Sequence, residues 1–119
     1  MRDHLSQIFQ ALADPTRRAL LAELALGEAN ISDLSKPFLN KLSQPAITKH
    51  LKVLEQAGLV RKTKDAQWRN CSLKVAPLRE ASDWIDQYRE LWEQTLDRLG
   101  DYLSEVQTLE RKVKGKKDE

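Results

Sequence analysis

The stretch SQPAITKHLKVLEQAGLV, residues 43–60, contains polar side chains spaced so that they would lie on one side of an α-helix. At 100° per residue, Thr48, Lys49 and Lys52 lie on the side opposite the apolar residues of that helix. Glutamine can pair bidentately with adenine, and lysine can donate hydrogen bonds to guanine. Gln44, Thr48 and Lys49 therefore have the chemistry to contact base edges of a nucleic acid.

A second set of side chains can contact phosphate groups, because each ends in a cationic or a hydrogen-bonding group. It consists of Ser43, His50, Lys52, Lys62, Lys64 and Arg69. His50 lies near the apolar side of its helix, so a structural hydrogen bond is an alternative role for it. Gln67 and Trp68 stay unassigned. Arg17 and Arg18 could contact a phosphate backbone or form ion pairs with nearby acids.

The charge of the chain is segregated along the sequence, although the net charge is only +2. Residues 1–35 contain three basic and five acidic residues, and residues 75–119 contain eight basic and eleven acidic residues. Between them, residues 36–74 contain nine basic and two acidic residues, a net charge of +7. A basic segment of this kind indicates a face that binds a polyanion.

The composition restricts the other classes of function. A chain of 119 residues is long enough for one domain with its own core. It has no run of 18 apolar residues and its N-terminus carries acids, so we expect neither a membrane span nor a signal peptide. The single cysteine, Cys71, favours a reducing cytoplasm. We find no phosphate-binding loop, metal cluster or nucleophile beside a base, so we expect no enzyme and no cofactor.

The elements that must position these residues begin with three helices. Apolar residues three and four apart predict a short helix around residues 5–12. Asp14 is a suitable N-cap for a second helix. A third short helix follows, capped by Asn30 or Ser32 and limited in length by Pro37, which removes a helical hydrogen bond.

The fourth predicted helix, residues 43–57, carries the side chains suited to base contacts. Ser43 is its expected N-cap and Gly58 its expected stop. Residues 60–73 then have the pattern of a basic, two-stranded hairpin with a turn at Asp65–Ala66. The hairpin would carry Lys62, Lys64 and Arg69.

One long amphipathic helix is predicted from Pro77 to about residue 110. Its apolar stripe is too long for a domain of this size to cover, so we expect a second copy of the helix against it in a two-fold dimer. The alternatives are a break near Gly100, or an aromatic ligand cage in place of an interface. The expected dimer interface consists of Leu5, Phe9, Trp84, Tyr88, Leu91, Trp92, Leu96 and Leu99.

The order of these elements is typical of a winged helix-turn-helix, a mainly α fold with a small β-hairpin. We expect a DNA-binding core over residues 1–76, a dimerisation helix over 77–110 and a charged, disordered tail over 111–119. In this fold the fourth helix enters the major groove of DNA, and the basic hairpin, or wing, reaches phosphates or the neighbouring minor groove.

The motifs LADPTRRALLAEL, ISDLSKPF and SQPAITKHLKVLEQAGLV, with the basic hairpin and APLREASDWIDQYRELWEQTLDRLGDYL, resemble the ArsR family of winged-helix transcriptional regulators. The resemblance covers roughly residues 5–105 and implies a homodimeric, cytoplasmic DNA-binding repressor. The family's metal sites do not carry over. Asn30 and Ser32 stand where one site has paired cysteines, and the last helix has acids but no histidine. We therefore expect no bound metal.

The sequence thus predicts a homodimeric, sequence-specific regulator that binds double-stranded DNA and most simply represses transcription. Its site should be an imperfect palindrome with half-sites about 34 Å apart. These residues do not define any small-molecule or protein inducer. The alternative is a protein-interaction module that docks a basic partner on the last helix, because residues 78–110 contain three basic and nine acidic residues.

Overall fold

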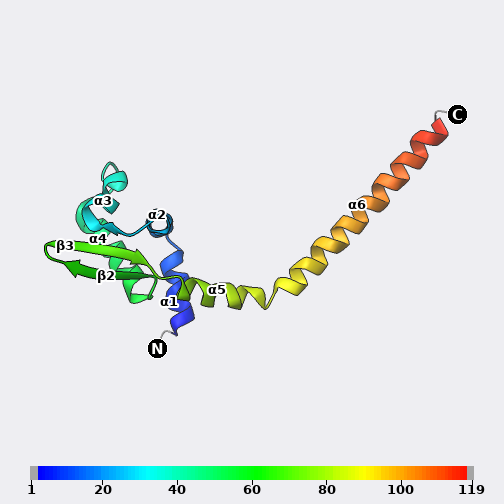
Figure 1. Cartoon of the computed structure of the whole chain (residues 1–119). Helices are drawn as coiled ribbons and strands as arrows, with labels where there is room; N and C mark the ends of the chain where they lie inside the picture. Colours follow the sequence, from blue (N-terminus) through cyan, green and yellow to red (C-terminus); the bar gives the residue numbers. More distant parts are fainter. Residues whose placement is uncertain (1–2, 118–119) are drawn as a thin grey trace. The chain divides into compact units, whose positions relative to one another are not determined.

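A computed structural model describes residues 3–117 of the chain. The chain divides into two compact units, with the boundary after Ser82. The first unit contains α1 (His4–Leu12), α2 (Pro15–Ala25), β1 (Ala29–Asn30), α3 (Ile31–Ser35), the 3₁₀ turn η1 (Lys36–Phe38), α4 (Gln44–Gln56), β2 (Val60–Asp65) and β3 (Trp68–Leu73). Helix α5 (Ala76–Asp86) crosses the boundary, and α6 (Arg89–Lys117) belongs to the second unit (Figure 1).

The predicted fold class, mainly α with a small β-hairpin, is confirmed. Strands β2 and β3 form the hairpin, which we call the wing. The hairpin is part of a three-stranded antiparallel sheet in the order β1-β3-β2, in which Ala29 pairs with Cys71 and Asn30 with Asn70. The sequence analysis missed β1 because a strand of two residues shows no alternation of apolar and polar side chains.

Side-chain caps fix the starts of the helices that surround the wing. Asp14 and Ser43 cap α2 and α4, and their side-chain oxygens accept backbone N–H bonds at 3.1 and 3.3 Å. Asn30, rather than Ser32, caps α3, accepting a backbone N–H bond at 2.8 Å. Beyond Ser35 the chain passes into η1, which contains Pro37 as its second residue. The predicted caps and the predicted effect of this proline are therefore confirmed.

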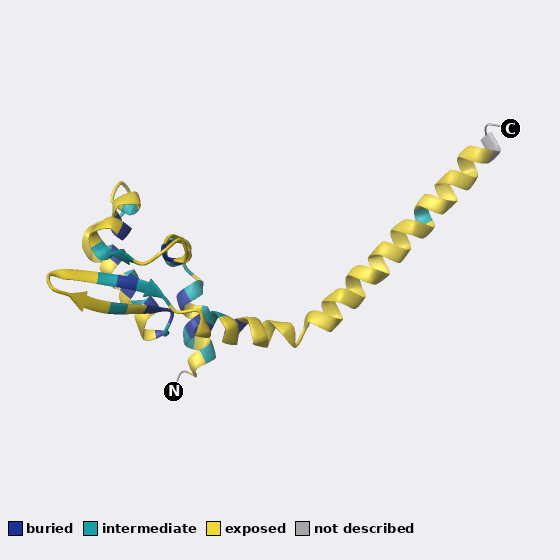
Figure 2. Cartoon of the chain, in the orientation of Figure 1, coloured by how far each residue is buried: buried dark blue, intermediate teal, exposed yellow. Residues whose placement is uncertain are grey.

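The core of the first unit lies under helix α4. Ile47, Leu51 and Leu54 of α4 are completely buried, together with Cys71 of β3. They pack with apolar residues of α2, α3 and β2 in one cluster. Burial raises the pKa of the Cys71 thiol, which keeps the sulfur protonated and unreactive. The core thus holds α4 by one face and leaves the other face exposed (Figure 2).

The wing closes with the short loop that the sequence predicts. Register in the hairpin pairs Asp65 with Trp68, so only Ala66 and Gln67 lie between the strands. Ala66 has φ of 55°, in the left-handed region that side chains with a Cβ disfavour. The wing tip therefore carries local backbone strain.

The prediction of one continuous last helix is wrong. The helix is interrupted at Gln87 and Tyr88, whose amides donate to carbonyls three residues earlier at 3.3 and 3.0 Å and so tighten the turn. No break occurs at Gly100, which lies inside α6. Helix α6 also continues to Lys117, so residues 111–117 are helical where we expected a disordered tail, and residues 118–119 of that expected tail lie outside the described residues. The apolar spacing continues across the interruption and for that reason does not reveal it.

The second unit has almost no buried surface. Among the α6 side chains that the structure describes, only Val106 is half-buried, and the others are exposed (Figure 2). The exposed set includes large apolar side chains, such as Trp92 at 61% and Leu96 at 56%. Within residues 3–117, no helix combines the length and the apolarity needed to cross a membrane.

Candidate nucleic-acid interface

Helices α3 and α4 and the wing together line a groove of about 560 Å³. Its lining consists of Asn30, Ile31, Ser32, Gln44, Thr48, Lys62, Gln67, Trp68 and Arg69. Two predicted base-contacting residues, Gln44 and Thr48, thus share one groove with two predicted phosphate contacts, Lys62 and Arg69. We call it the α3–α4–wing groove.

Gln44 is held in place by a buried side chain beneath it. Its Nε2 atom donates to Ser35 Oγ at 3.2 Å, and Ser35 Oγ donates to the backbone oxygen of Ile31 at 2.6 Å. Ser35 is completely buried, so helix α3 sets the direction of the Gln44 amide. Thr48 Oγ1 donates to the backbone oxygen of Gln44 at 3.0 Å, and its lone pairs can still accept hydrogen bonds.

Four other predicted DNA contacts do not line this groove. They are Ser43, Lys52 and Lys64, predicted to contact phosphates, and Lys49, predicted to contact a base edge, and all four are exposed. Lys62 is less accessible, because 24% of its side chain is exposed and its Nζ atom lies 3.8 Å from Glu55 Oε1. An ion pair of this length in partly exposed surroundings is weak, so it leaves the lysine able to exchange its partner.

His50 lies elsewhere. Its Nδ1 atom is 3.3 Å from Arg17 Nη1 and 3.9 Å from Asp14 Oδ2, and its side chain is 23% exposed. Because a guanidinium group only donates, Nδ1 is the acceptor of the arginine bond. These contacts support a structural role for His50, in which it accepts a hydrogen bond from Arg17. His50 does not line the α3–α4–wing groove.

Arg17 and Arg18 both donate hydrogen bonds to backbone carbonyls of α1. Arg17 donates from Nε to the Ala11 oxygen at 2.7 Å and from Nη2 to the Gln10 oxygen at 2.9 Å. Arg18 donates from Nη1 to the Leu12 oxygen at 2.8 Å. These carbonyls belong to the last turn of α1, where helix geometry leaves few backbone partners, although the Gln10 oxygen also accepts from the Ala13 amide at 3.2 Å. The two arginines therefore cap the C-terminus of α1 from α2.

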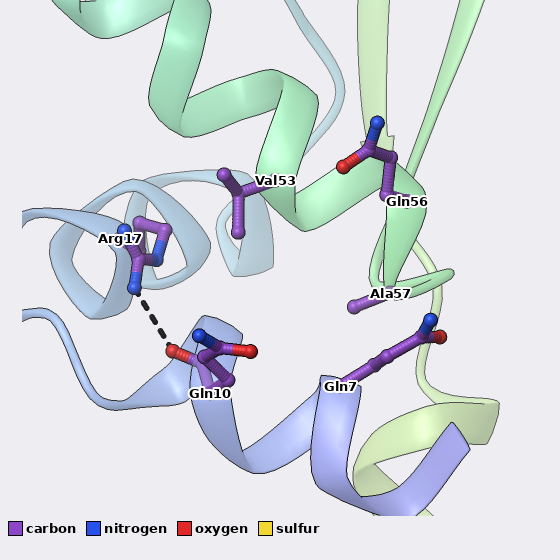
Figure 3. A pocket seen from close by; sticks show the side chains of 6 residues that line it. All are labelled: Gln7, Gln10, Arg17, Val53, Gln56 and Ala57. Atoms are coloured by element: carbon purple, nitrogen blue, oxygen red, sulfur yellow. Dashed lines mark hydrogen bonds between the residues drawn. The ribbon is translucent and has the colours of Figure 1, made fainter. Parts of the chain in front are cut away.

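A smaller cleft of about 260 Å³ lies between α1, α2 and the end of α4 (Figure 3). Its lining consists of Gln7, Gln10, Arg17, Val53, Gln56 and Ala57. The guanidinium of Arg17 faces the Gln10 carbonyl across this cleft, and that bond is the one drawn. Three glutamines, one arginine and two apolar residues line the cleft, and this set contains no acid–base or nucleophilic pair.

The predicted dimer-interface residues of α5 and α6 are exposed, from 40% at Trp84 to 64% at Leu91. The rings of Trp84 and Tyr88 are tilted by 59° with centroids 5.3 Å apart. Leu5 and Phe9 of α1 are half-buried. Over residues 3–117, no group of three or more His, Cys, Asp or Glu side chains is placed to hold a metal ion.

Sequence reasoning missed the contribution of α3 to the groove. Asn30 and Ser32 line it, whereas the sequence indicates only helix-capping roles for them and the absence of metal-binding cysteines at their positions. Trp68 lines it as well, with 53% of its surface exposed. An exposed aromatic residue beside a basic turn was the signal available in the sequence, but the closeness of α3 to the wing arises from the unpredicted β1–β3 pairing.

A family model described as a helix-turn-helix domain matches residues 12–63. The transcriptional repressor SdpR of Bacillus subtilis is 31% identical over 81 residues, which are 68% of this chain and 88% of that protein. A crystal structure of an ArsR family transcriptional regulator is 42% identical and has a TM-score of 0.70, covering 76% of this chain and 98% of its own.

A more distant solution structure supports the fold alone. It is the homodimeric winged helix-turn-helix DNA-binding domain of a possible ArsR-family regulator from Mycobacterium bovis, with 17% identity and a TM-score of 0.56. It covers 81% of this chain and 84% of that one. With the higher identities above and the winged arrangement of α3, α4 and the hairpin, the assignment is complete: this chain belongs to the ArsR family of transcriptional regulators.

Proposed function

We propose that this chain is a homodimeric repressor that recognises an imperfect palindrome in double-stranded DNA. In each protomer, α4 would enter the major groove and the wing would contact the backbone or the neighbouring minor groove. The observation that carries the proposal is the α3–α4–wing groove, which brings Gln44 and Thr48 together with Lys62 and Arg69. The name of the Bacillus relative, a transcriptional repressor, supports repression.

The residue roles follow from chemistry and position. Gln44, Thr48 and Lys49 would contact base edges, because they stand on the exposed edge of α4 and have donors and acceptors that match purines. Ser43, Lys52, Lys62, Lys64 and Arg69 would contact phosphates, which fix the register on the duplex without reading sequence. His50 would support α4 from behind through Arg17 rather than bind phosphate.

Dimerisation is the second part of the proposal. Residues 1–76 would form the DNA-binding core, and residues 77–110 would dimerise with a second copy. Support comes from the exposed apolar side chains of α6, which a monomer leaves in water, and from the homodimeric state of the Mycobacterium bovis domain. A two-fold dimer would present two α4 helices to successive major grooves.

Selection of bound fragments from a random DNA pool, followed by titration of the selected site, tests the function. Thr48→Ala and Gln44→Ala should each relax base preference at one position of each half-site. Lys62→Ala should weaken binding to selected and random DNA alike and reduce the salt slope by about 1. Lys112→Ala, which removes an exposed lysine of α6, is the matched control and should leave affinity for both DNAs unchanged.

Two outcomes would contradict the proposal. If the three α4 and wing variants lose equal affinity for selected and random DNA, the assignment of base contacts is wrong. If the unchanged chain shows no salt-sensitive DNA binding at all, the alternative function gains support. In that alternative the chain is a protein-interaction module that binds its partner through the acidic last helix. That alternative has its own basis, since residues 89–110 contain six acidic and two basic residues.

A further inference from the structure

The α3–α4–wing groove lies between two elements that the proposed function assigns to different parts of a DNA duplex. Its lining includes Gln44 and Thr48 of α4, and Lys62, Trp68 and Arg69 of the wing. In a duplex, one sugar–phosphate strand separates each major groove from the neighbouring minor groove. If α4 lies in a major groove and the wing lies on the backbone or in the next minor groove, that strand has to pass between α4 and the wing. The α3–α4–wing groove is the space that it would occupy.

We propose that this groove holds the strand by its sugar as well as by its phosphates, with the indole ring of Trp68 packed against one deoxyribose. The inference rests on the proposed function and goes beyond it, because that function assigns contacts to bases and phosphates only and gives Trp68 no role. It makes Trp68 a residue that selects the type of sugar, deoxyribose over ribose, and not the base sequence.

The charges of the groove match two phosphates. Its nine lining residues include two cations, Lys62 and Arg69, and no acid. Lys62 pairs with Cys71 across the hairpin, and Arg69 stands two residues before Cys71 on β3, so the two cations are diagonal neighbours on one face of the wing. Diagonal neighbours of this kind lie about 7–8 Å apart, which is close to the distance between successive phosphates of one DNA strand. Lys62 and Arg69 can therefore contact two successive phosphates.

The apolar part of the lining matches the sugar between those phosphates. It consists of Trp68, which is 53% exposed, and Ile31 at the start of α3, which is half-buried. A DNA strand alternates charged phosphates with sugars, and the C–H groups of a deoxyribose are apolar. An exposed indole that directly precedes Arg69 in the chain fits this alternation. Packing the ring on a sugar would remove apolar surface of both from water, which is favourable.

A contact of this kind distinguishes deoxyribose from ribose. The 2′-carbon carries only hydrogens in DNA, whereas in RNA it carries a hydroxyl group that both donates and accepts hydrogen bonds. The indole ring of Trp68 has a single N–H donor and no acceptor, so its face offers no partner to a hydroxyl group. Covering a hydroxyl group without a hydrogen-bond partner costs free energy. The packed ring should therefore favour a strand that has no 2′-hydroxyl at this sugar.

A ribonucleotide scan of the selected duplex tests the sugar contact. In each duplex one deoxynucleotide is replaced by the matching ribonucleotide, and the Kd of the full chain is measured. The unchanged chain should bind about tenfold more weakly at one position of each half-site. Trp68→Ala should abolish this sensitivity and weaken binding to selected and random all-deoxy DNA equally. Trp68→Phe keeps an aromatic ring and should retain the sensitivity. Leu26→Ala, which removes an apolar side chain that is 85% exposed and outside the groove, is the matched control and should behave like the unchanged chain.

A scan with methylphosphonates, which remove the charge of one phosphate at a time, tests the position of the strand independently. A neutral phosphate should weaken binding of the unchanged chain wherever a cation contacts it. Lys62→Ala should lose its sensitivity at one phosphate and Arg69→Ala at another. These two phosphates should lie on either side of the sugar that the ribonucleotide scan identifies. If they are not successive, or if that sugar does not lie between them, the proposed path of the strand through the groove is wrong.

The outcomes separate the sugar contact from the proposed function. If the unchanged chain binds its selected DNA but tolerates a ribonucleotide at every position, or if Trp68→Ala remains as sensitive as the unchanged chain, the sugar contact is overturned and the function stands. Relaxed base preference of Trp68→Ala at one position would also overturn it, because Trp68 would then contact a base. A chain that prefers no sequence but discriminates against ribonucleotides through Trp68 supports the sugar contact and contradicts the function. Absence of any DNA binding contradicts both.

Discussion

The Nη1 atom of Arg17 lies 3.3 Å from the Nδ1 atom of His50, and this contact joins helix α2 to helix α4. The same guanidinium donates to two carbonyls at the end of α1, at 2.7 and 2.9 Å. One side chain therefore connects three helices, including the helix proposed to enter the DNA groove. Its effect on DNA binding would be indirect, through the position of α4.

Arg17→Ala should lower the free energy of unfolding by about 1–3 kcal/mol, because it removes the side-chain donor to the part-buried Ala11 carbonyl as well as an exposed bond to the Gln10 carbonyl. Arg18→Ala removes a single, exposed bond to Leu12 and is the matched control, with a smaller expected loss. Urea unfolding of both variants measures the difference. If both variants lose the same free energy of unfolding, the contacts of Arg17 contribute no more to stability than the single bond of Arg18. Arg17→Lys should not restore stability, because an ammonium group cannot reproduce the planar fork.

Asp14 should make part of the stability dependent on pH. Burial raises the pKa of its carboxyl, but the backbone hydrogen bond from Arg17 and the nearby His50 and Arg17 side chains outweigh this and hold the pKa below its ordinary value. Because the folded pKa is the lower one, this contribution is present above about pH 4 and is lost as the pH falls through the folded pKa.

Two variants separate the charge of Asp14 from its capping. Asp14→Asn keeps a good N-cap and should remove this acid-dependent contribution, whereas Asp14→Ala should also cost about 1 kcal/mol at neutral pH. Free energies of unfolding of both variants, measured from neutral to acidic pH, would separate the two effects. If Asp14→Asn has the same pH dependence as the unchanged chain, the carboxylate is not the source.

Gly58 ends helix α4 with φ of 78°, a conformation that residues with a Cβ disfavour. A Cβ there would lie 3.4 Å from Pro77 Cγ and 3.7 Å from His4 Nε2. Gly58→Ala should therefore destabilise the first unit by about 1–2 kcal/mol in urea unfolding. Gly100→Ala is the control, because Gly100 is helical with open space around it, and its helix should gain about 0.5–1 kcal/mol. Similar effects of the two substitutions would contradict the role of the left-handed conformation.

Ser35 should influence base preference without touching DNA. Ser35→Ala removes the hydrogen bond that orients the Gln44 amide. We expect weaker discrimination at the base that Gln44 contacts and unchanged affinity for random DNA. The effects of Ser35→Ala and Gln44→Ala should not add, because both act through one contact. Loss of discrimination at every position of the site would show instead that Ser35 only stabilises α3.

The local features of this chain followed from its sequence because their causes lie within one turn of the chain. Asp14 and Ser43 cap their helices through atoms three residues away. The apolar face of α4 and the basic wing also follow from spacing, which is why the fold class and the family were recognisable. The residues of the proposed DNA contacts could be named from their types.

Only the tertiary structure decided the contacts between residues far apart in the sequence. The approach of His50 to Arg17, 33 residues earlier in the chain, could not be read from the sequence, which left a structural hydrogen bond and a phosphate contact both open for this histidine. The pairing of β1 with β3 and the support of Gln44 by Ser35 likewise depend on packing that periodicity does not encode. Periodicity determines which face of an element is apolar. The partner of each polar side chain is determined by the folded arrangement, because a buried donor or acceptor must bond to whatever group lies near it.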